Sequence, residues 1–235
     1  MISTHCTATF AFIALVAAAA CATPAAAAER TPPERASFAE DSASAPASAL
    51  ASWAVATGDN HALPFVIVDK VAAKLFLFDR HGTLRAATAV LVGLARGDIS
   101  PPGIGNRKLS QIAPADRITP AGRFIGEKGI NLAGRGIVWV DYDTAIAIHR
   151  VTDVKPGMTS RDRLSRLSSV SPSDRRISLG CINVSEAFYD AYIRPTFDAS
   201  SAVVYILPEA KALNDVFAIP AAFTVTTPTA MPARG

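Results

Sequence analysis

The sequence predicts a mainly β fold, a sandwich or a barrel, formed by residues 62–210. From Phe65 onward the apolar residues come in short runs of strand length that are rich in Val and Ile. Turn residues separate these runs, as in the stretch from Asp79 to Gly82. Short, β-branched, turn-bounded segments favour an all-β domain over alternating β and α units.

Six strands are expected in this domain. In order, they cover residues 65–68, 74–78, 83–92, 136–140, 144–149 and 202–207. The first three form a β meander that closes at Gly93. One short helix is expected after Cys181, because Ser185 can cap it and Glu186 falls in its first turn. Pro195 is expected to end that helix.

Residues 1–28 have the pattern of a secretory signal. The apolar run over residues 10–20 has the length of a signal's hydrophobic region, and Ala26 to Ala28 offer a small-residue cleavage site. The run is shorter than the roughly 20 apolar residues of a membrane-spanning helix. Cys21 follows two alanines and leaves a lipid anchor as an alternative. We therefore expect an exported protein, located in the periplasm or cell envelope.

The expected domain is flanked by two segments that have little to bury. Residues 29–61 are rich in Ala, Ser, Pro and acidic residues, which predicts a disordered linker. Beyond Pro208 the strand pattern is lost, and residues 211–235 are predicted to be a C-terminal tail. A single domain between them agrees with a length of 235 residues.

Charge and motif content exclude several classes of function. The net charge of +3 and pI near 8.9 lack the concentrated Lys and Arg patches that bind nucleic acid. No Cys-x-x-Cys or His-x-x-x-His pair suggests a zinc site, and no Gly-x-x-x-x-Gly-Lys loop suggests phosphate binding. We expect no metal, no cofactor and no nucleic acid, and the sequence implies no stable protein partner.

Cys181 is the only cysteine beyond the signal region, since Cys6 and Cys21 lie within it or at its edge. An unpaired cysteine in an oxidising compartment indicates either thorough burial or a use for the thiol. The cysteine count leaves both interpretations open. As a nucleophile, the thiol would need a neighbour that takes its proton, and histidine is the usual partner near neutral pH.

His149 is the histidine best placed for that role. It ends a predicted strand of alternating Ala and Ile, and strand ends present side chains to a site on a rigid element. His5 leaves with the signal, His61 stands at the linker boundary, and His81 falls in a predicted turn. A structural histidine is the alternative interpretation of His149.

The residues around Cys181 favour chemistry over packing. Gly180 would let the backbone approach a substrate, and amides near Cys181 can stabilise the oxyanion of an acyl-transfer intermediate. The stretch Ser178 to Asn183, SLGCIN, resembles the signature of the L,D-transpeptidase (YkuD-like) family, Ser/Thr-His-Gly-Cys-x-Asn/Arg. Ile148-His149 is similar to the upstream Ile/Val-His pair of that family.

Two further stretches strengthen the resemblance. Residues 119–124 are similar to the family's Thr-Pro-x-Gly-x-Phe, and residues 66–93 resemble its opening hairpin. The resemblance covers roughly residues 64–208 and implies an L,D-transpeptidase-type sandwich or barrel, with one short helix after Cys181 and a loop or helical insertion before it.

The resemblance also implies a reaction. Cys181 would attack a peptidoglycan stem peptide, form a thioester and release the terminal D-Ala, in cell-wall cross-linking or remodelling. His149 would be the base, oriented by the backbone carbonyl of Arg150, and Gly180 would complete the catalytic residues. The substrate-binding residues expected from the motif are Ser178, Asn183 and Arg176.

The chain departs from the family pattern in two places. Leu179 stands where the family has a histidine, and Cys181 follows His149 by 32 positions, which implies an insertion within residues 151–176. Residues 150–176 hold seven basic and three acidic residues. This stretch is either a flap that steers acidic stem peptides or a solvated loop.

The acceptor of the acyl group is left open by the sequence. A stem peptide, a protein lysine, a D-amino acid or water would each give a different product. Besides a transpeptidase, we therefore consider a carboxypeptidase or hydrolase of the same bonds, and a non-catalytic peptidoglycan-binding relative.

Overall fold

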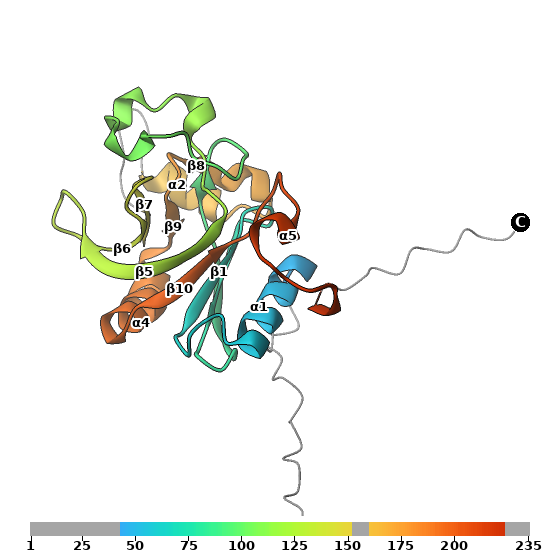
Figure 1. Ribbon diagram of the computed structural model, residues 1–235. Coiled ribbons are helices and arrows are strands. Elements are labelled where there is room, and N and C mark those ends of the chain that lie inside the picture. Colours follow the sequence, from blue (N-terminus) through green and yellow to red (C-terminus); the bar gives the residue numbers. More distant parts are fainter. Residues whose placement is uncertain (1–42, 152–159, 224–235) are drawn as a thin grey trace, which may run out of the picture. The chain divides into compact units, whose positions relative to one another are not determined.

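The computed structural model describes residues 43–151 and 160–223, and it confirms a mainly β fold (Figure 1). The strands are β1 Phe65–Asp69, β2 Lys74–Phe78, β3 Leu84–Ala89, β4 Val92–Gly93, β5 Gly122–Ile130, β6 Gly136–Asp141, β7 Ile146–Arg150, β8 Arg176–Ser178, β9 Ile182–Val184 and β10 Ala202–Ile206. The α-helices are α1 Ala45–Thr57, α2 Ser160–Leu167, α3 Glu186–Phe188, α4 Arg194–Ala199 and α5 Leu213–Val216. Short 3₁₀ helices are η1 Ile104–Asn106, η2 Leu109–Gln111, η3 Pro114–Asp116, η4 Pro172–Arg175 and η6 Ala221–Phe223, and η5 Tyr189–Ile193 is a π-helical turn.

Eight strands form one mixed sheet in the order β3-β2-β1-β10-β5-β6-β7-β9. The pairs β1/β10 and β7/β9 are parallel, and the other neighbours in this sheet are antiparallel. Leu91, just after β3, exchanges two backbone hydrogen bonds of 2.9 Å with Asn183 of β9. The two edges of the sheet therefore meet, and the sheet is a nearly closed barrel. Beside it, β4 and β8 form a short parallel pair.

The residues of β1 are buried on both faces of the sheet. Val66 and Val68 belong to the apolar cluster that fills the barrel interior. Phe65 and Ile67 point the other way, as the two-residue repeat of a strand requires, and pack in a second cluster that includes Leu50 of α1. Because both faces of β1 are covered, its sequence is an uninterrupted apolar run from Phe65 to Val68.

A disordered linker was predicted over residues 29–61. The structure contradicts this prediction for residues 43–61, which include the helix α1. The helix α1 lies beside β1 (Figure 1). Ser44 caps it by accepting a hydrogen bond from the amide of Ala47, and Gly58 ends it in a left-handed conformation. Few branched residues are needed to bury it, because alanine favours helices and Leu50 and Trp53 supply large apolar side chains.

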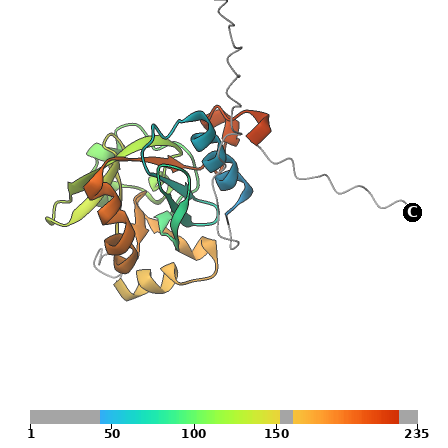
Figure 2. The same ribbon diagram turned by 90° about the horizontal axis from the view of Figure 1, so that it is seen from below.

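The prediction of a C-terminal tail from residue 211 is also wrong at its start, because the folded part continues through α5 and η6. After α5, Phe217 and Ile219 are 4% and 3% exposed and pack in the same cluster as α1. Figure 2 shows α1 and the C-terminal segment side by side. The folded part thus extends beyond residues 62–210 at both ends. Residues 1–42, which include the predicted signal and Cys21, and residues 224–235 lie outside the described residues.

The helix after Cys181 begins as predicted and continues past Pro195. Ser185 caps it through a 3.2 Å hydrogen bond from the amide of Phe188. A π-helical turn then leads into α4, where Pro195 occupies the first turn. Proline is tolerated there because that turn does not need its missing N–H. The helix α4 packs against β5.

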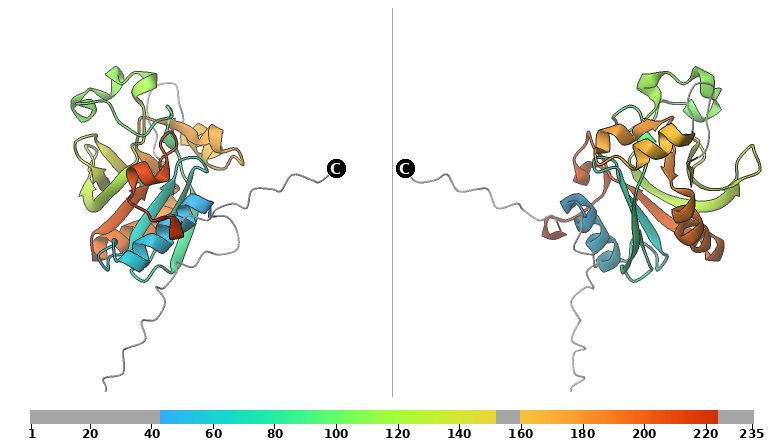
Figure 3. Two further views of the ribbon diagram at one scale, coloured as in Figure 1. Left: turned by 45° about the vertical axis from the view of Figure 1, so that its right-hand side comes forward. Right: turned by 180° about the vertical axis from the view of Figure 1, so that it is seen from behind.

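The insertion before Cys181 contains a helix, α2, and the turn η4. Residues 152–159 of this insertion are outside the described residues. Figure 3 shows α2 and η4 on the outside of the barrel, and Arg163 of α2 lines one cavity with Ile104 of η1 and Leu109 of η2. None of the helices in the described parts of the chain combines the length and apolar content needed to cross a bilayer.

Candidate active site

Cys181 and His149 line the same cavity, which has a volume of about 230 Å³. Its walls come from the segment between β4 and β5, the β6–β7 turn, the helix α2 and the residues around Cys181. The lining residues are Ile104, Gly105, Arg107, Leu109, Ile112, Asn131, Thr144, Ala145, Ile146, His149, Arg163, Ser178, Leu179, Cys181 and Asn183.

Parallel pairing of β7 with β9 brings the two halves of the site together. His149 near the end of β7 is in register with Asn183 of β9, and Cys181 directly precedes β9. Ile148 on β7 is fully buried in the barrel, whereas His149 is partly exposed and lines the cavity. The long separation in sequence is therefore closed by neighbouring strands.

Gly180 has a packing role that the sequence interpretation did not foresee. Its φ is +134°, and an added Cβ would lie 2.8 Å from both the carbonyl oxygen of Ile118 and a methyl group of Ile146. Only glycine fits this position. The close approach is thus to the protein's own backbone, and the Gly180 amide already donates to Ser178 Oγ at 3.1 Å.

Thr119 fixes the peptide that precedes Cys181. Its hydroxyl donates to the carbonyl oxygen of Gly180 at 2.6 Å and accepts from the amide of Gly93 at 2.8 Å. Gly93 must be small, because an added Cβ would lie 2.3 Å from the carbonyl oxygen of Arg117. Gly93 and Thr119 both belong to stretches that carry the family resemblance, and here both contact the backbone next to Cys181 or its neighbours.

The imidazole of His149 is held by two hydrogen bonds. Its Nδ1 lies 2.8 Å from the carbonyl oxygen of Arg150, the contact that the resemblance implies, and its Nε2 lies 3.0 Å from Asn183 Nδ2. Asn183 Oδ1 accepts from the guanidinium of Arg163. A guanidinium only donates, so the amide of Asn183 must direct its NH₂ at His149. Nε2 is therefore the acceptor, and Nδ1 carries the proton.

Burial and the positive charge of Arg163 lower the pKa of His149, against the opposing effect of the Arg150 carbonyl. The imidazole is consequently neutral near pH 7, in the state that can accept a proton. Its only unprotonated nitrogen is Nε2, which the amide of Asn183 occupies in this structure.

The thiol of Cys181 is also held in its neutral form. Its Sγ donates to the carbonyl oxygen of Ala145 at 3.5 Å. Burial raises the pKa of the thiol, whereas the backbone amide of Ala147 and the charge of Arg163 oppose that rise. The hydrogen bonds found within residues 43–151 and 160–223 do not join Sγ to His149 directly.

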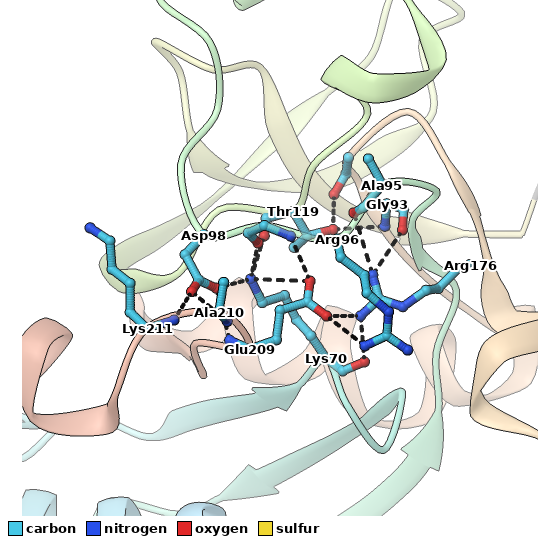
Figure 4. Close-up of polar contacts among 12 residues, drawn as sticks. Lys70, Gly93, Ala95, Arg96, Asp98, Thr119, Arg176, Glu209, Ala210 and Lys211 are labelled. Atoms are coloured by element: carbon cyan, nitrogen blue, oxygen red, sulfur yellow. Dashed lines mark hydrogen bonds and ion pairs between the residues drawn. The ribbon is translucent and has the colours of Figure 1, made fainter.

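Arg176 does not bind substrate in this arrangement, which corrects the sequence-based assignment. Its guanidinium is buried and donates to the carbonyl oxygens of Gly93 (3.3 Å) and Lys70 (3.1 Å) and to the carboxylate of Glu209 (Figure 4). It does not line the cavity that holds Cys181. Arg175 and Arg176 precede the motif, and the sequence does not indicate which way either side chain points.

A buried ionic cluster around Lys70 includes Thr119 (Figure 4). Lys70 Nζ donates to Asp98 Oδ1 at 2.7 Å, to the carbonyl oxygen of Gly97 at 2.5 Å and to that of Thr119 at 2.9 Å. All three ammonium donors are thus used. The cluster fixes Thr119, which in turn positions the peptide before Cys181.

Arg163 is the site residue that sequence reasoning missed. It was one of seven basic residues in a stretch of mixed charge, and its position on α2 places it against Asn183. Ser178, Asn183 and Leu179, by contrast, lie in the cavity where the motif predicts them. Within the described residues, no three His, Cys, Asp or Glu side chains gather closely enough to hold a metal ion.

No protein-family model and no curated protein matches the chain. Similar solved structures include the helical cell shape determining protein Pgp2 from Campylobacter jejuni, with 16% identity and a TM-score of 0.39 over 63% of this chain and 49% of that one. Another is an L,D-transpeptidase from Xylanimonas cellulosilytica, with 14% identity and a TM-score of 0.38 over 61% of this chain and 60% of that one.

An L,D-transpeptidase from Mycobacterium smegmatis is similar at 16% identity and a TM-score of 0.35, over 61% of this chain and 58% of that one. The chain thus spans about half the length of Pgp2 and less than two thirds of the other two. At this level of similarity the likeness bears on neither reaction nor substrate. The residues of the cavity have to carry the function.

Proposed function

We propose that this protein is a cysteine acyltransferase that acts on peptidoglycan stem peptides, an L,D-transpeptidase working through a thioester. One observation carries the proposal. The thiol of Cys181 shares a cavity with a neutral imidazole, His149, whose tautomer is set by the Arg150 carbonyl. These residues belong to motifs that resemble the L,D-transpeptidase signature.

The first half-reaction forms the acyl-enzyme. Nε2 of His149 takes the proton of Cys181, and the thiolate attacks the carbonyl carbon of the third stem residue, a diamino acid. The tetrahedral intermediate collapses as the bond to the terminal D-Ala breaks, and His149 gives its proton to the leaving amine. The products are a thioester and free D-Ala.

The second half-reaction regenerates the thiol. An acceptor amine attacks the thioester carbonyl and loses a proton to His149, and Cys181 leaves as thiolate and is reprotonated. With the Gly180 amide engaged by Ser178, the backbone amide of Cys181 is the donor that we assign to the oxyanion.

The structure suggests what substrate binding must change. Nε2 accepts from Asn183 and the thiol donates to Ala145, so both catalytic groups are occupied by the protein itself. We propose that a bound stem peptide displaces these two hydrogen bonds and brings Sγ and Nε2 together. Apo sites commonly hold such groups apart and tighten on binding.

Product analysis on purified disaccharide-tetrapeptide tests the proposal. We expect the wild-type protein to release D-Ala and to form cross-linked dimers, and Cys181→Ser to do neither at an unchanged thermal midpoint. If the products contain tripeptide but no dimers, the activity is that of a carboxypeptidase and not of a transpeptidase. Binding to sacculi with no release of D-Ala would favour the non-catalytic relative and overturn the proposal.

This substrate lies outside the cytoplasmic membrane, in agreement with the signal pattern of residues 1–28. We therefore propose the periplasm or cell envelope as the place of action.

A further inference from the structure

Arg163 carries a buried positive charge that the protein leaves only partly satisfied. The residue is 6% exposed, and one nitrogen of its guanidinium donates to Asn183 Oδ1. Its Nε is buried without a hydrogen-bond partner in the described parts of the chain. Leaving such a donor unpaired is unfavourable, by more for a charged group than for a neutral one.

Within residues 43–151 and 160–223, no ion pair is found between Arg163 and a carboxylate. Burial lowers the pKa of Arg163, and the nearby Cys181 opposes this effect. The other arginine of the cavity differs, because Arg107 pairs with Asp116 at 2.8 Å. Arg163 therefore stands beside Cys181 as a cation to which the described residues supply no counter-ion, on an element that the family pattern lacks.

A guanidinium with a free Nε donor in a small cavity suits a carboxylate. Its planar set of donors matches two carboxylate oxygens, and the hydrogen bonds are charge-assisted. Lysine would offer charge without that fixed fork. The cavity thus has the chemistry to bind an anionic group within a short distance of Cys181 Sγ.

The proposed substrate has a carboxylate at the right distance. In a peptide that ends one residue after the attacked carbonyl, the terminal carboxylate carbon lies about 3 to 4 Å from the attacked carbon, because one residue separates them. If the diamino acid is diaminopimelate, its side-chain carboxylate lies several bonds further away. A cation close to Sγ therefore meets the terminal carboxylate first.

We propose that Arg163 is a specificity-determining residue that binds the α-carboxylate of the residue released from the donor peptide. This inference rests on the proposed function and adds a residue of the insertion to the site. It predicts that the enzyme requires a donor with a free carboxylate one residue beyond the scissile bond. Binding of the carboxylate draws the guanidinium toward the substrate and weakens its hydrogen bond to Asn183. The side chain of Asn183 can then move away from Nε2 of His149.

Charge removal at Arg163 has two separable effects. The guanidinium lowers the pKa of Cys181, so a neutral replacement slows acylation by every donor. Loss of carboxylate binding slows only donors that carry a carboxylate. The ratio of rates for a carboxylate donor and its carboxamide isolates the second effect.

The test uses two tetrapeptide donors that differ only at the C-terminus, one ending in D-Ala and one in D-Ala amide. Release of D-Ala or D-Ala amide is measured for the wild-type protein, Arg163→Gln, Arg163→Lys and Arg166→Gln. Arg166 lies on the same helix with an exposed contact to the carbonyl of Asp174, so it serves as the matched control.

We expect the wild-type protein and Arg166→Gln to prefer the acid by roughly 10- to 100-fold, the range for one charge-assisted pair. Arg163→Gln should act on both donors at similar low rates, and Arg163→Lys should keep part of the preference. An unchanged ratio in Arg163→Gln, or in Arg163→Lys if the first variant does not fold, would overturn the inference and leave the proposed function standing. Failure of the wild-type protein to act on either donor would overturn both.

Discussion

At the scale of single residues, the site stores its two reactive groups in neutral form. Burial raises the pKa of Cys181 and lowers that of His149, and Arg163 adds its charge to both environments. The thiol and the imidazole therefore do not form a thiolate–imidazolium pair before substrate arrives. An unreactive resting thiol also suits the envelope location that we propose, because the thiolate is the form that oxidation damages.

The pH dependence of thiol reactivity follows from these shifts. Alkylation requires the thiolate, and the pKa of Cys181 lies above its ordinary value of 9.0. We expect the rate of iodoacetamide labelling, mapped to Cys181 by peptide analysis, to keep rising through pH 9 in the free protein. Arg163→Gln should shift the curve to still higher pH, because it removes the cation that favours the thiolate. A plateau below pH 8.5 would contradict this assignment.

The sequence could identify the two central residues of the cavity, Cys181 and His149, but not all of their neighbours. Cys181 and His149 were predictable because motif and strand position coincide at each of them. Arg163 lies in a stretch without a local signal, and only tertiary packing brings it to Asn183. Gly180 was predicted to let the backbone approach a substrate. In the structure its small size instead allows the close contact with the carbonyl oxygen of Ile118.

At the scale of elements, the described part of the basic insertion, residues 160–176, has both buried and exposed arginines. Arg163 and Arg175 are buried, whereas Arg166 is exposed. Arg175 donates to the carbonyl oxygens of Ala73 and Ser169, which ties the insertion to the β1–β2 turn. Part of the basic charge is therefore structural, and one arginine is directed to the site.

Asp98 contributes a pH-dependent contact between the β4–β5 segment and the residues after β10. Burial would raise its pKa, but the hydrogen bonds from Lys70 and from the amides of residues 209–211 outweigh this and lower the pKa from 3.8 to about 2. A lowered pKa means that the ionised form stabilises the fold above pH 4 and that this contribution is lost as the pH falls through 2. It amounts to about 2 kcal/mol.

Asp98→Asn should therefore be destabilised by about 3 to 5 kcal/mol at pH 7, because Lys70 keeps a buried charge without its 2.7 Å partner. The difference in free energy of unfolding between the wild-type protein and this variant should decrease by about 2 kcal/mol as the pH falls from 5 to 2. Urea unfolding across this range measures it. A gap independent of pH would show that Asp98 does not carry the shifted pKa.

At the scale of the whole molecule, the sheet order was beyond sequence analysis. The pairs β1/β10 and β7/β9 join strands that are far apart in the chain, and no local pattern encodes them. The long strand β5 escaped notice because glycines and charged residues interrupt its apolar residues. One of these, Gly126, is needed because an added Cβ would lie 2.6 Å from the ring of Phe197.

The barrel is covered on one side by parts that composition assigned to a linker and a C-terminal tail. Helix α1 and the residues after α5 cover the outer face of β1 and β10, where Phe65 and Tyr205 would otherwise be exposed. Alanine-rich composition misled the boundary prediction, since a helix can bury alanine against a sheet without many branched residues. The reactive motif was not affected, because it lies on β7 and before β9, far along the sheet from β1.

The central claim is that Cys181 is the nucleophile and His149 its base. Mass spectrometry of the intact protein after incubation with a carbapenem, the β-lactam class to which the resembled family responds, tests it most directly. We predict one adduct in the wild-type protein, mapped to Cys181, none in Cys181→Ala, and formation slowed by roughly 10²- to 10⁴-fold in His149→Gln. An adduct that persists in Cys181→Ala would contradict the account.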